Sequence, residues 1–192
     1  TAESLKLGID ITRHSWKTLA SQEPNRYPKE LFTVLESTWV FNTVEWLDHY
    51  AKRDWTLTHM DYELDNVLID DDGPIVIDWQ SPMISHPGVD LAWLLAASHT
   101  EETLAVEEDF LKLYRDTLSS SGGPSWSLAE LEEALAWGIL YPVSCQAVPY
   151  LQDVSAYGEG AERMHQRFEK FVQGSIDAAV RWNLVDHLQP LI

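Results

Sequence analysis

The chain has few cations, one cysteine and no long apolar run, and each shortage excludes a class of protein. Its 13 Lys and Arg stand against 31 Asp and Glu, a formal charge of −18. Nucleic-acid binding needs clustered cations, so we exclude a nucleic-acid partner. The longest strongly apolar run, about residues 91–97, is far too short to cross a bilayer. The single Cys145 excludes an internal disulfide, and we expect a cytoplasmic protein.

Helical patterns dominate what is present. The 192 residues with 45% apolar content predict one cooperative domain over residues 1–192. Helices are predicted to begin at Pro28 (running to about residue 52), Val89, Thr100, Ser127 (running to about Trp137, with a kink at Pro142) and Gly160. On the helix after Thr100, one apolar stripe is predicted to hold Val106, Phe110, Leu113 and Tyr114.

A β-hairpin interrupts these helices, within the stretch LTHMDYELDNVLIDDDGPIVIDWQ. The runs NVLID and PIVID are predicted strands, joined by a turn at residues 71–73. Asn66 precedes the first strand and Asp78 ends the second, so a tight hairpin brings them together. They could meet as oxygen ligands of Mg²⁺, with Asp61 close by and free to accept a proton.

These residues also carry a resemblance. The spacing of His59, Asp61 and Asn66, followed by Asp78 after the hairpin, resembles the catalytic and metal-binding segments of protein-kinase-like phosphotransferases. The chain is similar to the aminoglycoside phosphotransferase and choline kinase superfamily. With GVDLAWLLAAS downstream, it most resembles the small-molecule kinases similar to ecdysteroid kinases, over about residues 57–98. One position departs, because Met60 stands where those kinases usually have glycine.

The resemblance implies an α+β, mostly α fold: the C-terminal lobe of a protein-kinase-like fold, helical, with the hairpin carrying the catalytic and metal-binding segments. It implies transfer of the ATP γ-phosphate to a hydroxyl of a small molecule, with Mg²⁺. Asp61 would accept the hydroxyl proton, Asn66 and Asp78 would hold Mg²⁺, and His59 and Asp90 would support the site. Its candidate acceptor-binding residues are Glu133, Trp137, Tyr141, Tyr150 and Trp182. The chain's acidity favours an aminoglycoside or amino alcohol as acceptor, and its tryptophans favour a sterol-like or aromatic alcohol.

The chain lacks the motifs of an N-terminal ATP-binding lobe. The residues before His59 contain no glycine-rich phosphate loop and no Val-Ala-x-Lys strand. We therefore expect that lobe to come from a longer protein or from a partner chain, and the chain alone to be inactive. The alternatives are a non-catalytic kinase-fold binding module, half of a split enzyme, or a metal-dependent phosphohydrolase, which would need more imidazole ligands.

Overall fold

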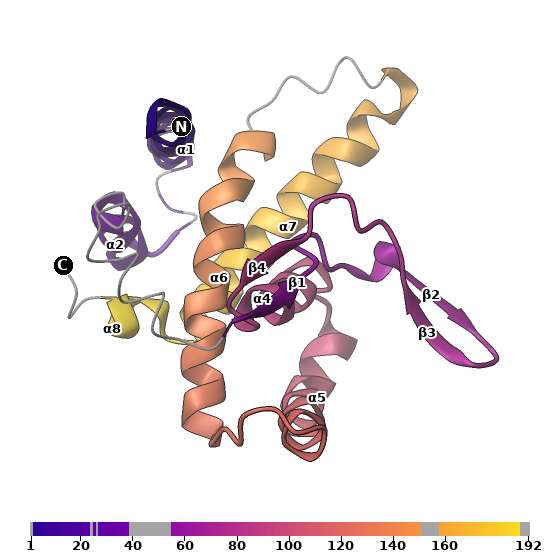
Figure 1. The fold of residues 1–192 in the computed structure, drawn as a ribbon. Helices are drawn as coiled ribbons and strands as arrows, with labels where there is room; N and C mark the ends of the chain where they lie inside the picture. The colour runs from indigo at the N-terminus through magenta and orange to yellow at the C-terminus, as the bar shows by residue number, and fades with distance from the viewer. Residues whose placement is uncertain (1, 24, 26, 39–54, 151–157, 189–192) are drawn as a thin grey trace.

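The computed structural model describes residues 2–23, 25, 27–38, 55–150 and 158–188, and these are mainly helical (Figure 1). The helices are α1 (Ala2–Gln22), α2 (Lys29–Thr38), the short 3₁₀ helix η2 (Leu64–Asn66), α4 (Gly88–Ala97), α5 (Glu101–Ser120), α6 (Leu128–Tyr150), α7 (Ala161–Arg181) and α8 (Leu184–Leu188). The strands are β1 (Thr56–Thr58), β2 (Val67–Asp70), β3 (Gly73–Val76) and β4 (Met83–Ser85). The predicted α+β, mostly α class is confirmed.

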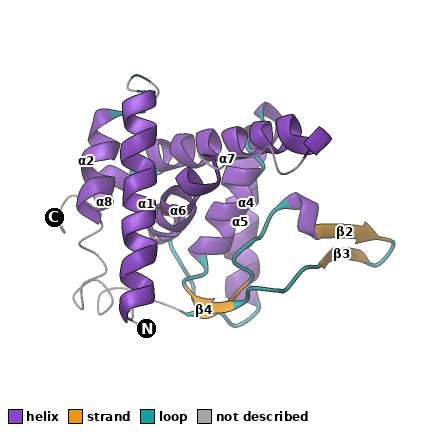
Figure 2. Ribbon diagram, turned by 90° about the horizontal axis from the view of Figure 1, so that it is seen from above, coloured by secondary structure: helices purple, strands orange, loops and turns teal. Residues whose placement is uncertain are grey.

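Helix α6 is the centre of the body. Its residues 134–140 are all buried, because α1, α4 and α7 pack around it. A helix covered on all sides needs no polar face, and this segment has none. On the side of α6 away from the hairpin, α1, α2 and α8 complete the body, as Figures 1 and 2 both show.

Glycines let α4 approach its neighbours backbone to backbone. A β-carbon built on Gly138 of α6 would lie 2.0 Å from the carbonyl oxygen of Gly88 in α4, and one on Gly88 would lie 2.0 Å from that of Ala134. The same holds where α4 meets α7, because a β-carbon on Gly174 would lie 2.2 Å from the Ala96 oxygen. Heavy atoms cannot approach so closely, so these crossings require glycine.

The predicted helix starts are confirmed where capping residues specified them. The Thr100 hydroxyl accepts the N–H of Thr103 at the start of α5, and the Thr103 hydroxyl in turn accepts the Thr100 N–H. Before α6, Ser127 and Glu130 form a capping box, in which the Glu130 carboxylate accepts the Ser127 N–H at 2.7 Å and the Ser127 hydroxyl accepts the Glu130 N–H. Helix α7 begins directly after Gly160.

Two predictions about helix surfaces and lengths are wrong. The stripe on α5 is divided: Phe110 and Tyr114 pack against the core, whereas Val106 and Leu113 are 56% and 65% exposed. Of the four predicted residues, only Phe110 and Tyr114 reach the core. Helix α6 does not end near Trp137 but runs to Tyr150. The burial of its apolar residues offsets the hydrogen bond that Pro142 cannot donate.

The helix predicted from Pro28 begins as expected, with α2 starting at Lys29, and its continuation from residue 39 to 52 lies outside the described residues.

The predicted hairpin is present, and a second strand pair was missed. Strands β2 and β3 pair antiparallel, from Val67 opposite Val76 to Asp70 opposite Gly73. The hairpin projects away from the helices in both views (Figures 1 and 2). Strands β1 and β4 also pair antiparallel, and this pairing closes residues 58–83 into a loop that holds the hairpin and all its polar residues. Within the described part of the chain, no helix could span a membrane.

Candidate functional site

The loop of residues 59–66 is fastened to α4 by one carboxylate. Asp90, in the first turn of α4, accepts the backbone N–H of His59 at Oδ2 (2.7 Å) and that of Met60 at Oδ1 (2.9 Å). His59 and Met60 are buried, so both N–H groups would lack a partner without this carboxylate. The shape of the loop therefore depends on the position of α4.

His59 connects the loop to the strand end that carries Asp78. The imidazole is 1% exposed, and its Nε2 lies 2.8 Å from the carbonyl oxygen of Ile77. A carbonyl can only accept, so Nε2 carries the proton and donates. The ring also packs edge-on against Trp79, with 4.7 Å between ring centroids. His59 is thus placed to hold the end of the hairpin.

Asn66 brings the two ends of the hairpin together beside Asp61. Its Nδ2 donates to the backbone oxygen of Asp61 at 2.8 Å and lies 3.5 Å from the Asp61 carboxylate. The backbone carbonyl of Asn66 accepts the N–H of Ile77 at 2.9 Å. Asp78 therefore follows directly after a residue that is hydrogen-bonded to Asn66. The structure therefore brings Asp61, Asn66 and the backbone of Asp78 to one region.

The oxygen atoms of this region are available to a ligand. Neither Asn66 Oδ1 nor the Asp78 carboxylate makes a hydrogen bond to any residue that the structure describes. Asp78 is exposed and has a φ of +62°, a conformation that is uncommon for any residue but glycine. Across the described ranges, no three His, Cys, Asp or Glu side chains gather as a metal cluster.

Met60 occupies a backbone conformation that favours glycine. Its φ is +69°, which brings a β-carbon close to the backbone, and this explains why a glycine suits the position. The methionine side chain is nevertheless 7% exposed, and its sulfur lies 3.2 Å from the hydroxyl of Thr58. Burial of the side chain offsets the unfavourable backbone.

A cavity of about 770 Å³ opens beside Asp61, between the loop, α4, the start of α5 and α7. This volume suits a small molecule. The lining has three parts. The loop contributes Asp61, Glu63, Leu64 and Asp65; α4 and the start of α5 contribute Trp93, Ala97, Ser98, Thr100 and Thr103; α7 contributes Arg163, Gln166, Arg167, Phe168, Lys170 and Phe171.

One ion pair joins the loop to α7 across this cavity. Arg167 contacts the Glu63 carboxylate and lies 4.0 Å from Asp65. Burial raises the pKa of Glu63, because the loss of solvation outweighs the attraction of Arg167, and the nearby charges of Asp61 and Asp65 raise the pKa further. The Glu63 carboxylate and the Arg167 guanidinium therefore face each other within the cavity as an ion pair.

Of the candidate acceptor residues, Glu133, Trp137, Tyr141 and Trp182 do not line this cavity. Trp137 and Tyr141 instead line a second, smaller cavity of about 200 Å³ together with Met60. Glu133 lines neither cavity, and the side chain of Tyr150 lies outside the described residues.

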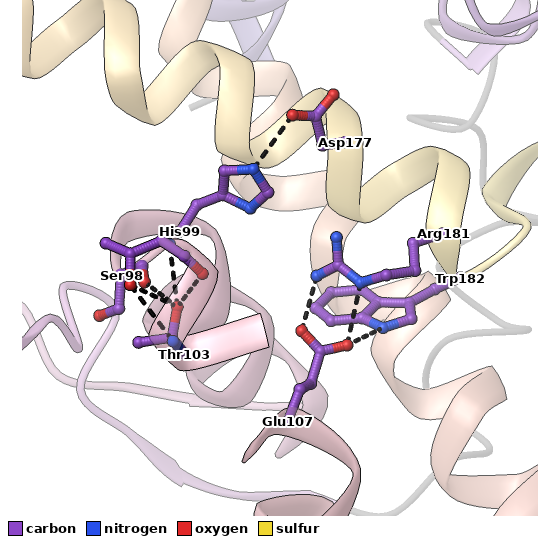
Figure 3. Close-up of polar contacts among 8 residues, drawn as sticks. Ser98, His99, Thr103, Glu107, Asp177, Arg181 and Trp182 are labelled. Atoms are coloured by element: carbon purple, nitrogen blue, oxygen red, sulfur yellow. Dashed lines mark hydrogen bonds and ion pairs between the residues drawn. The ribbon is translucent and has the colours of Figure 1, made fainter. Parts of the chain in front are cut away.

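Trp182 has a contact of another kind, which Figure 3 shows. It is 6% exposed, donates from Nε1 to Glu107 at 3.1 Å, and lies under the guanidinium of Arg181. Arg181 pairs with the same carboxylate at 2.7 Å, so these side chains join α5 to the end of α7. This places Trp182 in the packing of the body.

The sequence prediction missed the α7 side of the cavity. Arg163, Arg167 and Lys170 recur at helical spacing, but nothing local to α7 indicates that it packs beside the 59–66 loop. Neither Trp93 nor Phe171 was singled out from the sequence.

A family model described as the phosphotransferase enzyme family matches residues 8–127. The match covers more than half of the chain and includes the 59–66 loop, the hairpin and Asp90, but not α7. Neither the curated proteins nor the solved structures contain a significant match to the chain.

Proposed function

The chain belongs to the phosphotransferase enzyme family, and from this premise we propose that it transfers the γ-phosphate of ATP to a hydroxyl group of a small molecule. The observation that carries the proposal is the position of Asp61. Its carboxylate lines a cavity of small-molecule size, on a loop that Asp90 and Asn66 hold in one shape. A fixed carboxylate beside a substrate cavity is what proton transfer from an acceptor hydroxyl requires.

In the proposed reaction, the acceptor lies in the cavity with its hydroxyl against Asp61. Asp61 accepts the hydroxyl proton while the acceptor oxygen forms a bond to the γ-phosphorus of ATP. The bond from that phosphorus to the bridging oxygen breaks, and ADP leaves with the electron pair. Asp61 acts mainly by orienting the hydroxyl, because positioning does most of the work in such a transfer.

The residues at the hairpin ends fit Mg²⁺. Mg²⁺ prefers oxygen ligands and is usually held by one or two carboxylates together with substrate phosphates and water. Asn66 Oδ1 and the Asp78 carboxylate offer two such oxygens, neither of them engaged with another described residue. We propose that these two side chains hold the ion, which would neutralise charge on the phosphates of ATP.

The remaining contacts to ATP would come from a second lobe, in a longer protein or a partner chain. We therefore propose that assays use the complete protein or the assembled complex.

Asp61→Asn tests the proposed base. Asparagine keeps the size of the side chain but cannot accept the proton, so kcat for phosphoryl transfer to pooled alcohols should fall by about 100-fold or more. The affinity for Mg-ATP should stay nearly unchanged. Asp71→Asn, the same change in the exposed hairpin turn, is the control and should keep full activity. Full activity of the Asp61 variant would remove Asp61 from its role.

Asp78→Ala tests the proposed metal ligand. Loss of the carboxylate should weaken Mg-ATP binding by about tenfold, which calorimetry over a range of Mg²⁺ concentrations can measure. Asp72→Ala in the hairpin turn is the matched control. An unchanged affinity of the Asp78 variant at low Mg²⁺ contradicts the metal role.

A further inference from the structure

One face of α7 presents three cations to the cavity beside Asp61. Arg163, Arg167 and Lys170 stand at positions i, i+4 and i+7, so they follow one line along the helix, about 10 Å long. The chain has only 13 Lys and Arg in all, and a formal charge of −18. A line of three on one wall therefore contrasts with the charge of the rest of the molecule.

Ion pairs among the described residues do not account for this line. Arg167 pairs with Glu63, but neither Arg163 nor Lys170 forms an ion pair with any residue in the described part of the chain. Residues three and four positions from Lys170 within α7 are Arg167, Gln166, Gln173 and Gly174, none of them acidic.

The arrangement also opposes the stability of α7. Like charges three or four residues apart on a helix repel each other. Arg163 and Arg167 form one such pair, and Arg167 and Lys170 form another. Among the described residues only Arg167 of the three has an anionic partner, so the line favours an anionic partner from outside these residues.

The carboxylates of the cavity leave this positive character in place. Glu63 is occupied by Arg167, and Asp61 is the residue proposed to face the acceptor hydroxyl. Asp65 is 77% exposed, so solvent screens its charge. The local charge of the α7 wall is therefore the opposite of the charge of the whole chain.

An apolar surface adjoins the cations. Trp93 of α4 and Phe171 of α7 both line the cavity and meet edge to face, with ring centroids 5.0 Å apart. Phe171 is the neighbour of Lys170 in the chain, so a ligand bound by the cation can also contact the rings.

We propose that the acceptor is an alcohol that carries a carboxylate or phosphate group, bound by Arg163 and Lys170, with an apolar part against Trp93 and Phe171. The proposal rests on the phosphotransferase function above, since that function supplies the hydroxyl at Asp61. It differs from the aminoglycoside or amino alcohol that net charge alone favours. The family match ends before α7, so membership of the family does not specify this wall.

Four probes that share a phenyl ring and a secondary hydroxyl test the proposal. They are phenyllactate, 2-hydroxy-3-phenylpropyl phosphate, the neutral phenyllactamide and the cationic 1-amino-3-phenylpropan-2-ol. Each is measured with the complete protein in two ways: binding by calorimetry without nucleotide, and ADP release with Mg-ATP. The carboxylate and phosphate probes should bind about tenfold or more tightly than the amide, and the amine most weakly. The order of the two anionic probes identifies which anion the site takes.

The double variant Arg163→Gln/Lys170→Gln assigns the effect to these two side chains. Its affinity for the preferred anionic probe should fall by about tenfold or more, while its affinity for the amide and its KM for ATP stay unchanged. Lys112→Gln on α5, whose partner is Glu108 and which lies outside the cavity, is the control and should change neither.

The outcomes separate this proposal from the function on which it rests. Preference for the amine, equal binding of all four probes, or binding of none overturns the anionic acceptor. A raised KM for ATP in the double variant also overturns it, because the cations would then bind the nucleotide. Tight binding of an anionic probe that depends on Arg163 and Lys170, without phosphoryl transfer to any probe, supports the anionic site and contradicts the phosphotransferase function instead.

Discussion

In the helical body, α4 meets α6 and α7 so closely that backbones touch at glycines, whereas the hairpin β2–β3 leaves most of its side chains in solvent. Between these two regions lies the 59–66 loop, which the body holds through the two hydrogen bonds of Asp90. The residues proposed for the chemistry thus lie on a segment that buries little apolar surface. Stability and chemistry should therefore respond to different substitutions.

Gly138→Ala should have the largest effect on stability. Alanine in a helix interior normally stabilises by about 1 kcal/mol over glycine. Here the new methyl would meet the backbone of Gly88, with its carbonyl oxygen at 2.0 Å, so α4 and α6 would have to separate. We expect the free energy of unfolding to fall by about 1 to 3 kcal/mol in urea denaturation.

Gly160→Ala is the control for this prediction, because a β-carbon there meets nothing within 4 Å and the φ of −87° suits alanine. Its free energy of unfolding should change by about 0.5 kcal/mol or less. Equal effects of the two substitutions would show that the close approach of α4 and α6 does not determine the stability of the body.

The same division describes what sequence alone could predict of the fold. Helix starts at Thr100 and Ser127 are encoded in three or four adjacent residues, so capping patterns located them. The length of α6 depends on neighbours that bury residues 134–140 and Val143, and no local signal reports those neighbours. Strand β1 pairs with β4 some 25 residues later in the chain. The hydrogen bond from the Thr58 hydroxyl to the Met83 carbonyl supports this pair, and it too joins residues that are far apart in the sequence.

The candidate site divides in a similar way. The sequence could predict that Asn66 and Asp78 lie near each other with Asp61 close by, because a hairpin brings its own ends together. The α7 wall could not be predicted in this way, since the packing of α7 beside the loop is a property of the whole body. Average composition does not report this local feature: a net charge of −18 favours a cationic acceptor, while the α7 wall carries three cations.

Substitutions of Met60 test the backbone conformation of the 59–66 loop separately from the packing of the helical body. Met60→Ala and Met60→Gly remove almost the same buried side chain, but only glycine also relieves the φ of +69°. The glycine variant should therefore be the more stable of the two by about 1 kcal/mol in the free energy of unfolding.

Ala136→Gly in α6 provides the opposite case. At this buried helical position glycine should be less stable than alanine by about 1 kcal/mol. If alanine were also the better residue at position 60, the loop backbone would not have the left-handed conformation described here.

The smallest effect is expected at the hairpin, where Ile69 is 82% exposed. Ile69→Thr keeps a β-branched side chain and removes little buried surface, so the free energy of unfolding should change by about 0.5 kcal/mol or less. The identical substitution at Ile139, which is 0% exposed in α6, should cost about 2 kcal/mol or more because it puts a hydroxyl into the core. A loss above about 1 kcal/mol for Ile69→Thr would mean that Ile69 is covered in the folded protein. The hairpin would then belong to the packed body, and the separation of stability from chemistry would fail.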